Sequence, residues 1–207
     1  MRWWTADQHY GHSNIIRFCA RPYVKGGYPA TGWMNADLNT LHNAVVEPDD
    51  DVWMLGDVIM GPPGKNFVWA ESSVGRKTLV VGNHDKNFRR NGTPRPDRDD
   101  MYTQLGGFDT IIHGETTVTL ADGTVVLVSH FPYSGDSKHL ERYGDHRPTD
   151  EGMWLLHGHV HEKWQINGKQ INVGVDAWAG KPVSEQTIID IIHAGPTNRA
   201  PQPWTAN

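Results

Sequence analysis

The sequence predicts an α/β protein, a sandwich of two mixed β-sheets with helices outside. Two observations lead to this fold class. Apolar runs typical of strands alternate with helical patterns up to residue 81, which indicates parallel strands joined by crossover helices. From residue 115 onward, shorter β-rich runs are joined by hairpin signals, which indicates a second sheet containing antiparallel pairs.

The first half is expected to alternate strands with helices. Strands are expected over Arg2–Ala6, Asp51–Leu55 and Lys77–Val81. Ser13 can cap a short helix that runs through Cys19. A second helix has an apolar face formed by Met34, Leu38, Leu41 and Val45, and a third covers Asn66–Val74. In open sheets of this kind, ligands bind at the carboxyl ends of the strands.

The second half is expected to contain two hairpins and a closing helix. Turns at residues 121–123 and 167–169 join β-rich runs, the first pair being Glu115–Leu120 and Thr124–Ser129. Met153–Leu156 is a further expected strand, and Ser184 is the expected N-cap of a helix through His193. Residues 195–207 hold three prolines and no periodicity, so we expect one domain over 1–194 and a loosely ordered tail.

Composition narrows the class of protein. The 207 residues carry a net charge of −5, which gives no overall attraction to nucleic acid or membranes. Cys19 is the one cysteine, so an intrachain disulfide is excluded and a reducing, cytoplasmic location is expected. No apolar run approaches the ~20 residues of a membrane span, and no signal peptide fits the first residues. The twelve histidines are the unusual feature.

Five short polar segments follow or end the expected strands. They are Asp7-Gln8-His9, Gly56-Asp57, Gly82-Asn83-His84-Asp85, Ser129-His130 and Gly158-His159-Val160-His161. Their candidate ligands are Asp, Asn and His side chains, which offer oxygen and imidazole nitrogen but no thiolate. Such a set suits divalent Mn, Fe, Zn or Ni better than a sulfur-rich structural zinc site. Five such segments at strand ends predict a site for two metal ions.

The order of these segments resembles that of the calcineurin-like metallophosphoesterase superfamily, over residues 7 to 161. The longer stretches 7–16, 156–161 and 172–176 look like a small, single-domain branch found in bacteria and their phages. The resemblance implies a four-layer α/β/β/α sandwich with the site at the sheet edges.

The resemblance also implies two divalent ions, with Mn favoured and Fe, Ni, Co or Zn as alternatives. Asp7, His9 and His161 would bind one ion, Asn83, His130 and His159 the other, and Asp57 would bridge them. If His159 and His161 serve different ions, the chain must bend between them. His84 would be the general acid that protonates the leaving-group oxygen, with either Asp85 or a backbone carbonyl orienting its ring.

These roles imply a phosphoesterase, first of all a phosphodiesterase that hydrolyses nucleotide-like or cyclic-nucleotide diesters through a metal-activated water. Gly56-Asp57 is not followed by the further Asp and Arg of protein serine/threonine phosphatases, which speaks against phosphoprotein substrates. A phosphomonoesterase, or a nuclease acting on nucleic-acid ends, is the second candidate. A metal-stabilised binding module is the non-enzymatic alternative. The expected partner is a small phosphoester or nucleotide, with nucleic acid as a second candidate and no membrane.

Two further features stay open at this point. The run Lys86–Arg98 carries Lys86, Arg89, Arg90, Arg95 and Arg98 against Asp97, as either an anion-attracting rim or a solvated loop. His12 and His157 have no ligand role in the resemblance. A hydrogen-bonded structural role is favoured for His157, whereas substrate contact and helix-start hydrogen bonding are equally favoured for His12.

Overall fold

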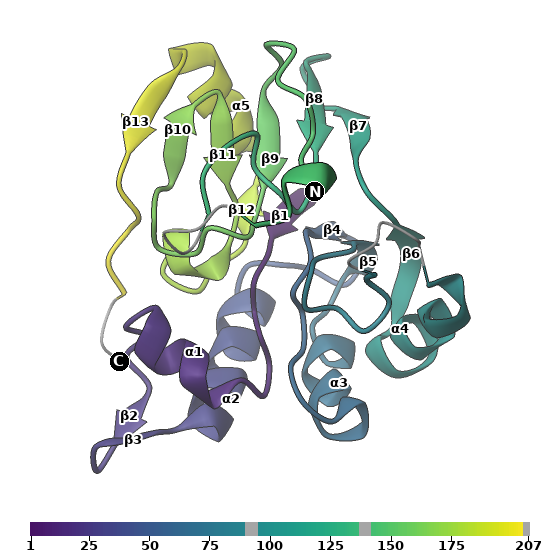
Figure 1. Ribbon diagram of the computed structural model, residues 1–207, viewed down its shortest axis with the longest axis vertical. Helices are drawn as coiled ribbons and strands as arrows, with labels where there is room; N and C mark the ends of the chain where they lie inside the picture. Colours follow the sequence, from purple (N-terminus) through teal and green to yellow (C-terminus); the bar gives the residue numbers. More distant parts are fainter. Residues whose placement is uncertain (90–94, 137–141, 205–207) are drawn as a thin grey trace.

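The computed structural model describes residues 1–89, 95–136 and 142–204, which form a mixed α/β fold (Figure 1). A five-stranded sheet has the order β12-β1-β4-β5-β6, and a six-stranded sheet has the order β13-β10-β11-β9-β8-β7. A small hairpin, β2 (Val24–Lys25) with β3 (Tyr28–Pro29), stands apart from both. The expected α/β class with two mixed sheets is confirmed.

The five-stranded sheet is parallel except at one edge. Strands β1 (Arg2–Thr5), β4 (Asp51–Met54), β5 (Arg76–Val80) and β6 (Phe108–Ile112) run parallel, and β12 (Val183–Ser184) pairs antiparallel with β1. Between these strands the chain forms α1 (Ser13–Phe18), α2 (Thr31–Asn43), α3 (Pro63–Glu71) and α4 (Asp99–Gly106). These four helices gather on the lower side of Figure 1, away from the second sheet.

The six-stranded sheet contains both expected hairpins. Its strands are β7 (Thr116–Thr119), β8 (Val125–Val128), β9 (Leu155–His157), β10 (Ile166–Gly168), β11 (Gln170–Asn172) and β13 (Thr197–Arg199). The β7–β8 and β10–β11 pairs are antiparallel, whereas β9 runs parallel to β8 and β11. Helix α5 (Glu185–Ala194) follows β12, and Ser184 caps it by accepting a hydrogen bond from the Thr187 amide, as expected.

Two apolar clusters place the sheets and helices. In β4, Val52 and Met54 face helices α1–α4, and the intervening Trp53 packs against the other cluster, because alternate strand residues point to opposite faces. The first cluster joins these helices to the five-stranded sheet. The second contains residues of both sheets, such as Trp4 and Val126, together with α5. The ends of the strands are therefore held at a common edge.

The structure corrects several sequence expectations. Ser13 is the first residue of α1 and does not cap it, because His12 occupies the N-cap position without a side-chain hydrogen bond. The tail expected to be loosely ordered contains β13, which pairs with β10, although residues 205–207 lie outside the described part. Helix α4 and strand β6 were not foreseen. Among the described residues, no helix is long and apolar enough to cross a membrane.

Candidate metal centre

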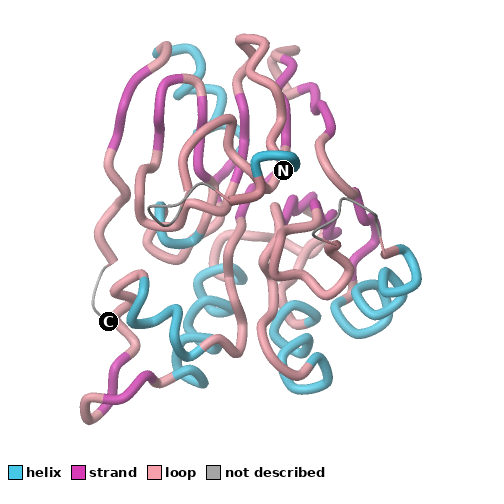
Figure 2. The backbone as a smooth tube through the Cα atoms, viewed as in Figure 1, coloured by secondary structure: helices cyan, strands magenta, loops and turns pink. Residues whose placement is uncertain are grey.

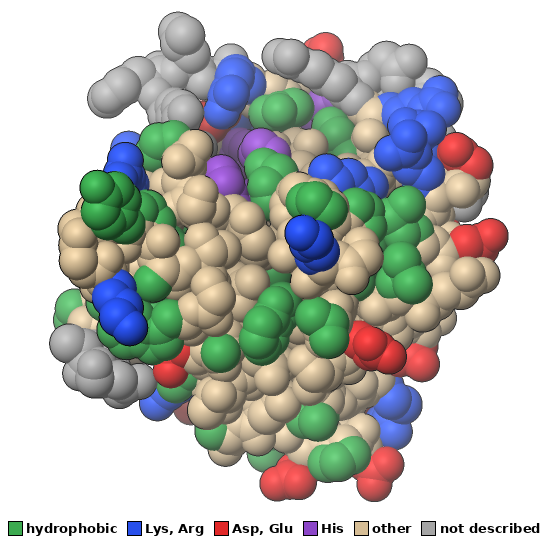
Figure 3. Space-filling model, turned by 90° about the horizontal axis from the view of Figure 1, so that it is seen from below, with side chains coloured by type: hydrophobic (Ala, Val, Ile, Leu, Met, Phe, Trp, Pro, Cys, Tyr) green, Lys and Arg blue, Asp and Glu red, His purple; other side chains and the backbone are tan. Residues whose placement is uncertain are grey.

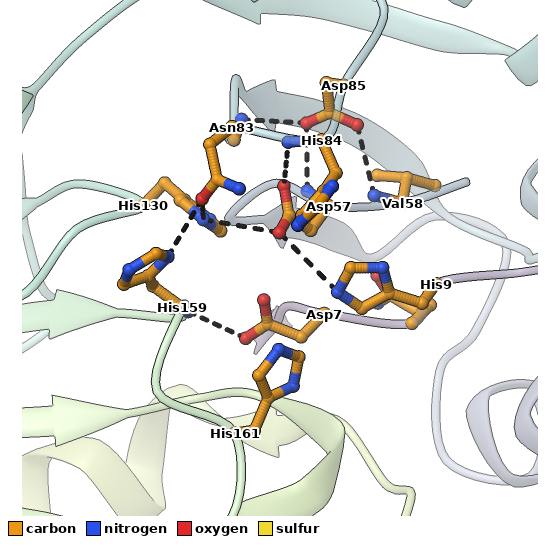
Figure 4. A network of polar contacts seen from close by, with 12 residues as sticks. Asp7, His9, Asp57, Val58, Asn83, His84, Asp85, His130, His159 and His161 are labelled. Atoms are coloured by element: carbon orange, nitrogen blue, oxygen red, sulfur yellow. Dashed lines mark hydrogen bonds and ion pairs between the residues drawn. The ribbon is translucent and has the colours of Figure 1, made fainter. Parts of the chain in front are cut away.

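The five polar segments lie together, beyond the C-terminal ends of β1, β4, β5, β8 and β9 (Figure 4). The backbone of these segments is loop, the class that Figure 2 draws in pink. All seven expected ligands are in this group, and all but the half-buried Asn83 are buried. The chain thus brings together, from both sheets, the residues that the sequence motifs singled out.

On one side of the centre, the Asn83 side-chain oxygen faces two imidazoles. It lies 2.9 Å from His159 Nδ1 and 3.1 Å from His130 Nε2. His130 Nδ1 lies 2.7 Å from the Leu55 carbonyl, to which it donates, so Nε2 carries the lone pair. The lone pair on His130 Nε2 therefore faces the Asn83 side-chain oxygen, and a bound cation can stabilise these two acceptors.

The Asp57 carboxylate lies between the two sides. One oxygen accepts a hydrogen bond from the His84 amide at 2.7 Å. The other lies 3.5 Å from His9 Nε2 and 3.6 Å from His130 Nε2. Burial alone would raise the pKa of Asp57, but the His130 and His84 rings and the His84 amide more than offset it and hold that pKa below its usual range. An ionised carboxylate in this place can contact an ion on either side.

On the other side, Asp7, His9 and His161 bring one ligand atom each to within 4.8 Å of one another. Asp7 Oδ1 and both ring nitrogens of His9 are buried and have no hydrogen-bond partner in the described structure. Burial lowers the pKa of His9 well below its ordinary value, so the ring is neutral, as metal ligation requires. Unpartnered buried acceptors are costly, and a bound cation would satisfy them. The side chains therefore fit divalent metal ions.

The backbone of the expected ligands is unusual. Asp7, His9, Asp57, His159 and His161 have φ values of 59°, 51°, 57°, 72° and 52°. They are five of the eight non-glycine residues with positive φ in the described chain. Such left-handed conformations cost ~1–2 kcal/mol each and cluster at functional sites. The values at His159 and His161 also confirm that the chain turns there.

Glycines allow the segments to approach closely. A Cβ atom at Gly82 would lie 2.5 Å from Asp57 Oδ1, and one at Gly158 would lie 2.7 Å from Asp7 Oδ2. Any side chain at either position would displace an expected ligand. Glycine at Gly82 and Gly158 is thus explained by the lack of room for a side chain.

A buried ion pair supports the centre and was missed by sequence reasoning. The Arg21 guanidinium donates two hydrogen bonds of 2.8 Å to the Asp176 carboxylate, and it also donates to the Asp7 and Gln8 carbonyls. Asp176 accepts a 2.9 Å hydrogen bond from His161 Nδ1, so Nε2 is the ring nitrogen that would bind a metal. Burial lowers the pKa of His161, but Asp7 and Asp176 more than offset it and hold that pKa well above its ordinary value, so a metal ion would have to displace a proton there. The stretch 172–176 was noticed as a pattern, but no sequence signal pairs Asp176 with Arg21.

Asp85 binds backbone amides instead of orienting the His84 ring. Its carboxylate accepts hydrogen bonds from the Gly82, Asp57 and Val58 amides at 2.8, 2.9 and 3.1 Å, and from the Tyr102 hydroxyl. It therefore ties two motif loops together and does not orient the His84 ring. His84 is exposed, with its ring centre 5.3 Å from that of His9.

A pocket of about 380 Å³ opens on this group. His9, His84 and His161 line one wall, and Ile15, Phe18 and Cys19, in and just after α1, line another. His12, Arg142, Glu162 and Lys163 complete the lining. Figure 3 shows histidine side chains in a hollow of this face, with Lys and Arg side chains nearby. The pocket gives a small molecule access to the centre.

The structure gives a location to His12, to His157 and to part of the charged run 86–98. His157 is fully buried, donates to the Gly158 carbonyl at 2.7 Å and accepts from the Trp164 indole, which supports a structural role. Of the described cations in the run 86–98, none lines the pocket at His84, and Arg89 lines a separate one of about 330 Å³. Arg90 lies outside the described residues. His12 lies in the pocket itself, in reach of a bound molecule.

Fold and site together define a mixed α/β protein with buried carboxylate–histidine clusters that could hold metal ions. No family model matches the chain. It is similar to the Gene 66 proteins of Mycobacterium phage L5 (32% identical; 92% of this chain, 93% of the relative) and Mycobacterium phage D29 (33%; 85% and 88%). The chain therefore belongs to the family of these phage Gene 66 proteins.

Similarity extends beyond phages. The crystal structure of a protein of unknown function from Aquifex aeolicus is 28% identical, with a TM-score of 0.68, covering 92% of this chain and 98% of that one. An uncharacterized protein of Methanocaldococcus jannaschii is 28% identical over 92% of this chain and 90% of its own length. Since these names state no activity, function must be argued from the site.

Proposed function

We propose that this protein is a dinuclear metal-dependent phosphoesterase with the four-layer calcineurin-like fold, and first of all a phosphodiesterase acting on nucleotide-like or cyclic-nucleotide diesters. One observation carries the proposal. Seven oxygen and imidazole ligands from five separate segments converge, and five of them hold a strained left-handed backbone. One apolar cluster lies between the helices and the five-stranded sheet, and the other lies between the two sheets. This layering is compatible with the four-layer sandwich.

The ligand geometry supports the division into two ions. Asp7, His9 and His161 would hold one, Asn83, His130 and His159 the other, and Asp57, whose carboxylate faces histidines of both sets, would take part in holding both. When bound, two divalent ions supply positive charge for the phosphate oxygens and a nucleophile at neutral pH. Asn83 adds no negative charge, so the centre keeps more attraction for phosphate.

Side chains around the pocket would supply the proton for the leaving group and further positive charge. His84, at the pocket wall, is placed to give a ring proton to the leaving oxygen of a bound ester. Among the described residues that line the pocket, Arg142 and Lys163 add positive charge and Glu162 adds one carboxylate. The apolar wall from α1 favours an ester that carries an organic leaving group.

The test uses metal-depleted protein, reloaded separately with Mn, Ni, Co, Fe, Mg or Zn. Bis(p-nitrophenyl) phosphate and p-nitrophenyl phosphate report diesterase and monoesterase activity. We expect metal-dependent turnover that is faster on the diester. Faster monoester turnover would make the protein a phosphomonoesterase, and no turnover with metals bound would leave a binding module.

His84 is tested with leaving groups of different quality. We expect His84→Ala to lose ~10²–10⁴-fold on a nucleoside or alkyl ester, because an alkoxide needs a proton to leave. A nitrophenolate leaves without one, so its ester should lose much less, with metal content unchanged. Equal losses on both esters would assign His84 to substrate positioning instead.

A further inference from the structure

We propose that the pocket between α1 and His84 binds the leaving group of the substrate, and that this group is a nucleoside whose base stacks on Phe18. The inference rests on the proposed function, because it assigns an occupant to the pocket that opens on the same centre. It adds a specificity site formed by residues outside the metal-binding segments.

The position of His84 fixes which part of a substrate enters the pocket. A general acid must come within ~2.6–3.2 Å of the oxygen that it protonates. His84 lines the pocket together with His9 and His161, so the group beyond that oxygen extends toward Ile15, Phe18 and Cys19. At about 380 Å³, the pocket falls in the range of small-molecule sites, ~300–1,000 Å³.

The walls match a flat, largely apolar group. Ile15 and Cys19 are buried and form an apolar floor. Phe18, at the end of α1, is 58% exposed and lines the pocket. Its ring meets that of His12 edge-to-face at 6.3 Å, and His12 also lines the pocket. A base that stacks on Phe18 would remove this exposed ring from water.

The rim favours a nucleoside joined to phosphate over a simple hydrocarbon. Arg142, Glu162 and Lys163 surround the apolar floor and offer both donors and acceptors to a ribose and to base edges. Among the described residues of the pocket lining, Arg142 and Lys163 outnumber the carboxylate of Glu162, which favours a phosphate nearby. An aliphatic leaving group would use the floor but none of these groups.

The experiment compares two diesters that share the retained nucleotide and differ in the leaving alcohol. One is a dinucleoside monophosphate, and the other is the ethyl ester of the same nucleotide. We expect Phe18→Ala to raise KM for the first about tenfold, the size of one lost base–aromatic stack, with kcat unchanged. KM for the ethyl ester should change less than about twofold. Equal changes in KM for both diesters, or no change for either, would overturn the proposal.

Matched variants separate stacking from folding and from general apolarity. Phe18→Trp should retain the wild-type KM, whereas Phe18→Leu should behave like Phe18→Ala, because leucine has no ring face. Tyr28→Ala is the surface control, since Tyr28 is 74% exposed on β3 and does not line the pocket. A wild-type KM for Phe18→Leu would mean that apolar contact alone suffices and would contradict stacking.

A binding measurement tests, independently of catalysis, whether the pocket holds a nucleoside. Adenosine is titrated into metal-free wild-type protein and into Phe18→Ala by calorimetry. We expect affinity to fall about tenfold in the variant, as for one lost stack. Absence of binding to the wild type, or equal affinity for both proteins, would contradict the proposal. If neither diester is hydrolysed with any metal, the proposed function fails and the adenosine titration alone decides the pocket.

Discussion

At the scale of single residues, Asp57 holds the central place. One of its oxygens is fixed by the His84 amide, and the other faces histidines on both sides of the centre. A carboxylate that is anchored on one side and free on the other is suited to bridge two ions, whereas His161 belongs to one side only.

We therefore expect Asp57→Asn, which keeps the shape but loses the charge, to lower metal content at both positions. His161→Ala should lower it at mainly one. Atomic emission on purified, dialysed protein measures ions per chain. The gain in thermal stability on adding metal should also shrink more in the Asp57 variant, since binding to the folded state is folding free energy. Wild-type metal content in Asp57→Asn would make the bridging role wrong.

Asp176 acts on the centre through His161. Burial would raise the pKa of Asp176, but Arg21 and His161 more than offset it and lower that pKa to about 2. We expect Asp176→Asn to weaken metal binding ~10–100-fold, the usual effect of losing a carboxylate behind a ligating histidine. Competition with a chelator of known affinity measures this. Asp190→Asn, on the outer face of α5, is the matched control and should bind as the wild type does.

The sequence could foresee that the seven expected ligand residues lie together, because each stands in a motif at a strand end. It could not foresee Arg21 or Asp176, because a pair 155 positions apart is brought together only by the fold. It also could not decide the role of Asp85. That carboxylate is engaged by backbone amides, and such contacts leave no pattern in the side chains of a sequence.

At the scale of elements, His42 joins α2 to the chain after α3. It is buried, and its Nε2 donates a hydrogen bond to the Val74 carbonyl at 2.9 Å. Burial, only partly offset by that hydrogen bond, lowers the pKa of His42 from 6.5 to about 4. The unfolded chain therefore binds the proton more readily between these values. The stability contributed by neutral His42 is complete above pH 6.5 and is lost as the pH falls toward 4.

We expect His42→Gln to remove this part of the acid sensitivity. Glutamine keeps an N–H donor but does not titrate, so between pH 7 and 4 the wild type should lose about 3 kcal/mol more unfolding free energy than the variant. Urea unfolding at several pH values measures the difference. Parallel pH curves for the two proteins would show that His42 is not the group responsible.

Elements were foreseen where periodicity is strong and missed where it is weak. The β7–β8 and β10–β11 hairpins were predicted by Gly-containing turns between β-rich runs. Helix α4 begins at Asp99 in a stretch dominated by charge, and it buries little besides Tyr102. Strand β13 is exposed along its length, so it carries no apolar alternation to recognise.

At the scale of the whole molecule, the C-terminal segment links the two halves. Strand β13 pairs with β10 of the six-stranded sheet, and Trp204 then packs edge-to-face on Tyr23, 5.7 Å between ring centres. The Arg21 guanidinium lies 5.9 Å from the Trp204 ring. After β13 the segment descends toward α1 (Figure 1).

Deleting residues 195–207 should therefore lower the unfolding free energy by about 2–3 kcal/mol, through a lost strand and a lost, partly buried tryptophan. The urea midpoint measures this. Deleting only 205–207 is the control, because it leaves β13 and Trp204 in place. An unchanged midpoint for the longer deletion would show that the segment adds no stability.

The left-handed backbone at the expected ligands has a consequence for how this protein can change. At those five positions glycine would relax the chain, yet glycine has no side chain with which to bind anything. Selection for stability alone would favour replacements that remove the proposed metal ligands. The proposed centre therefore limits the folding stability that this chain can reach while keeping its ligands. Stabilising substitutions should be made at positions outside it.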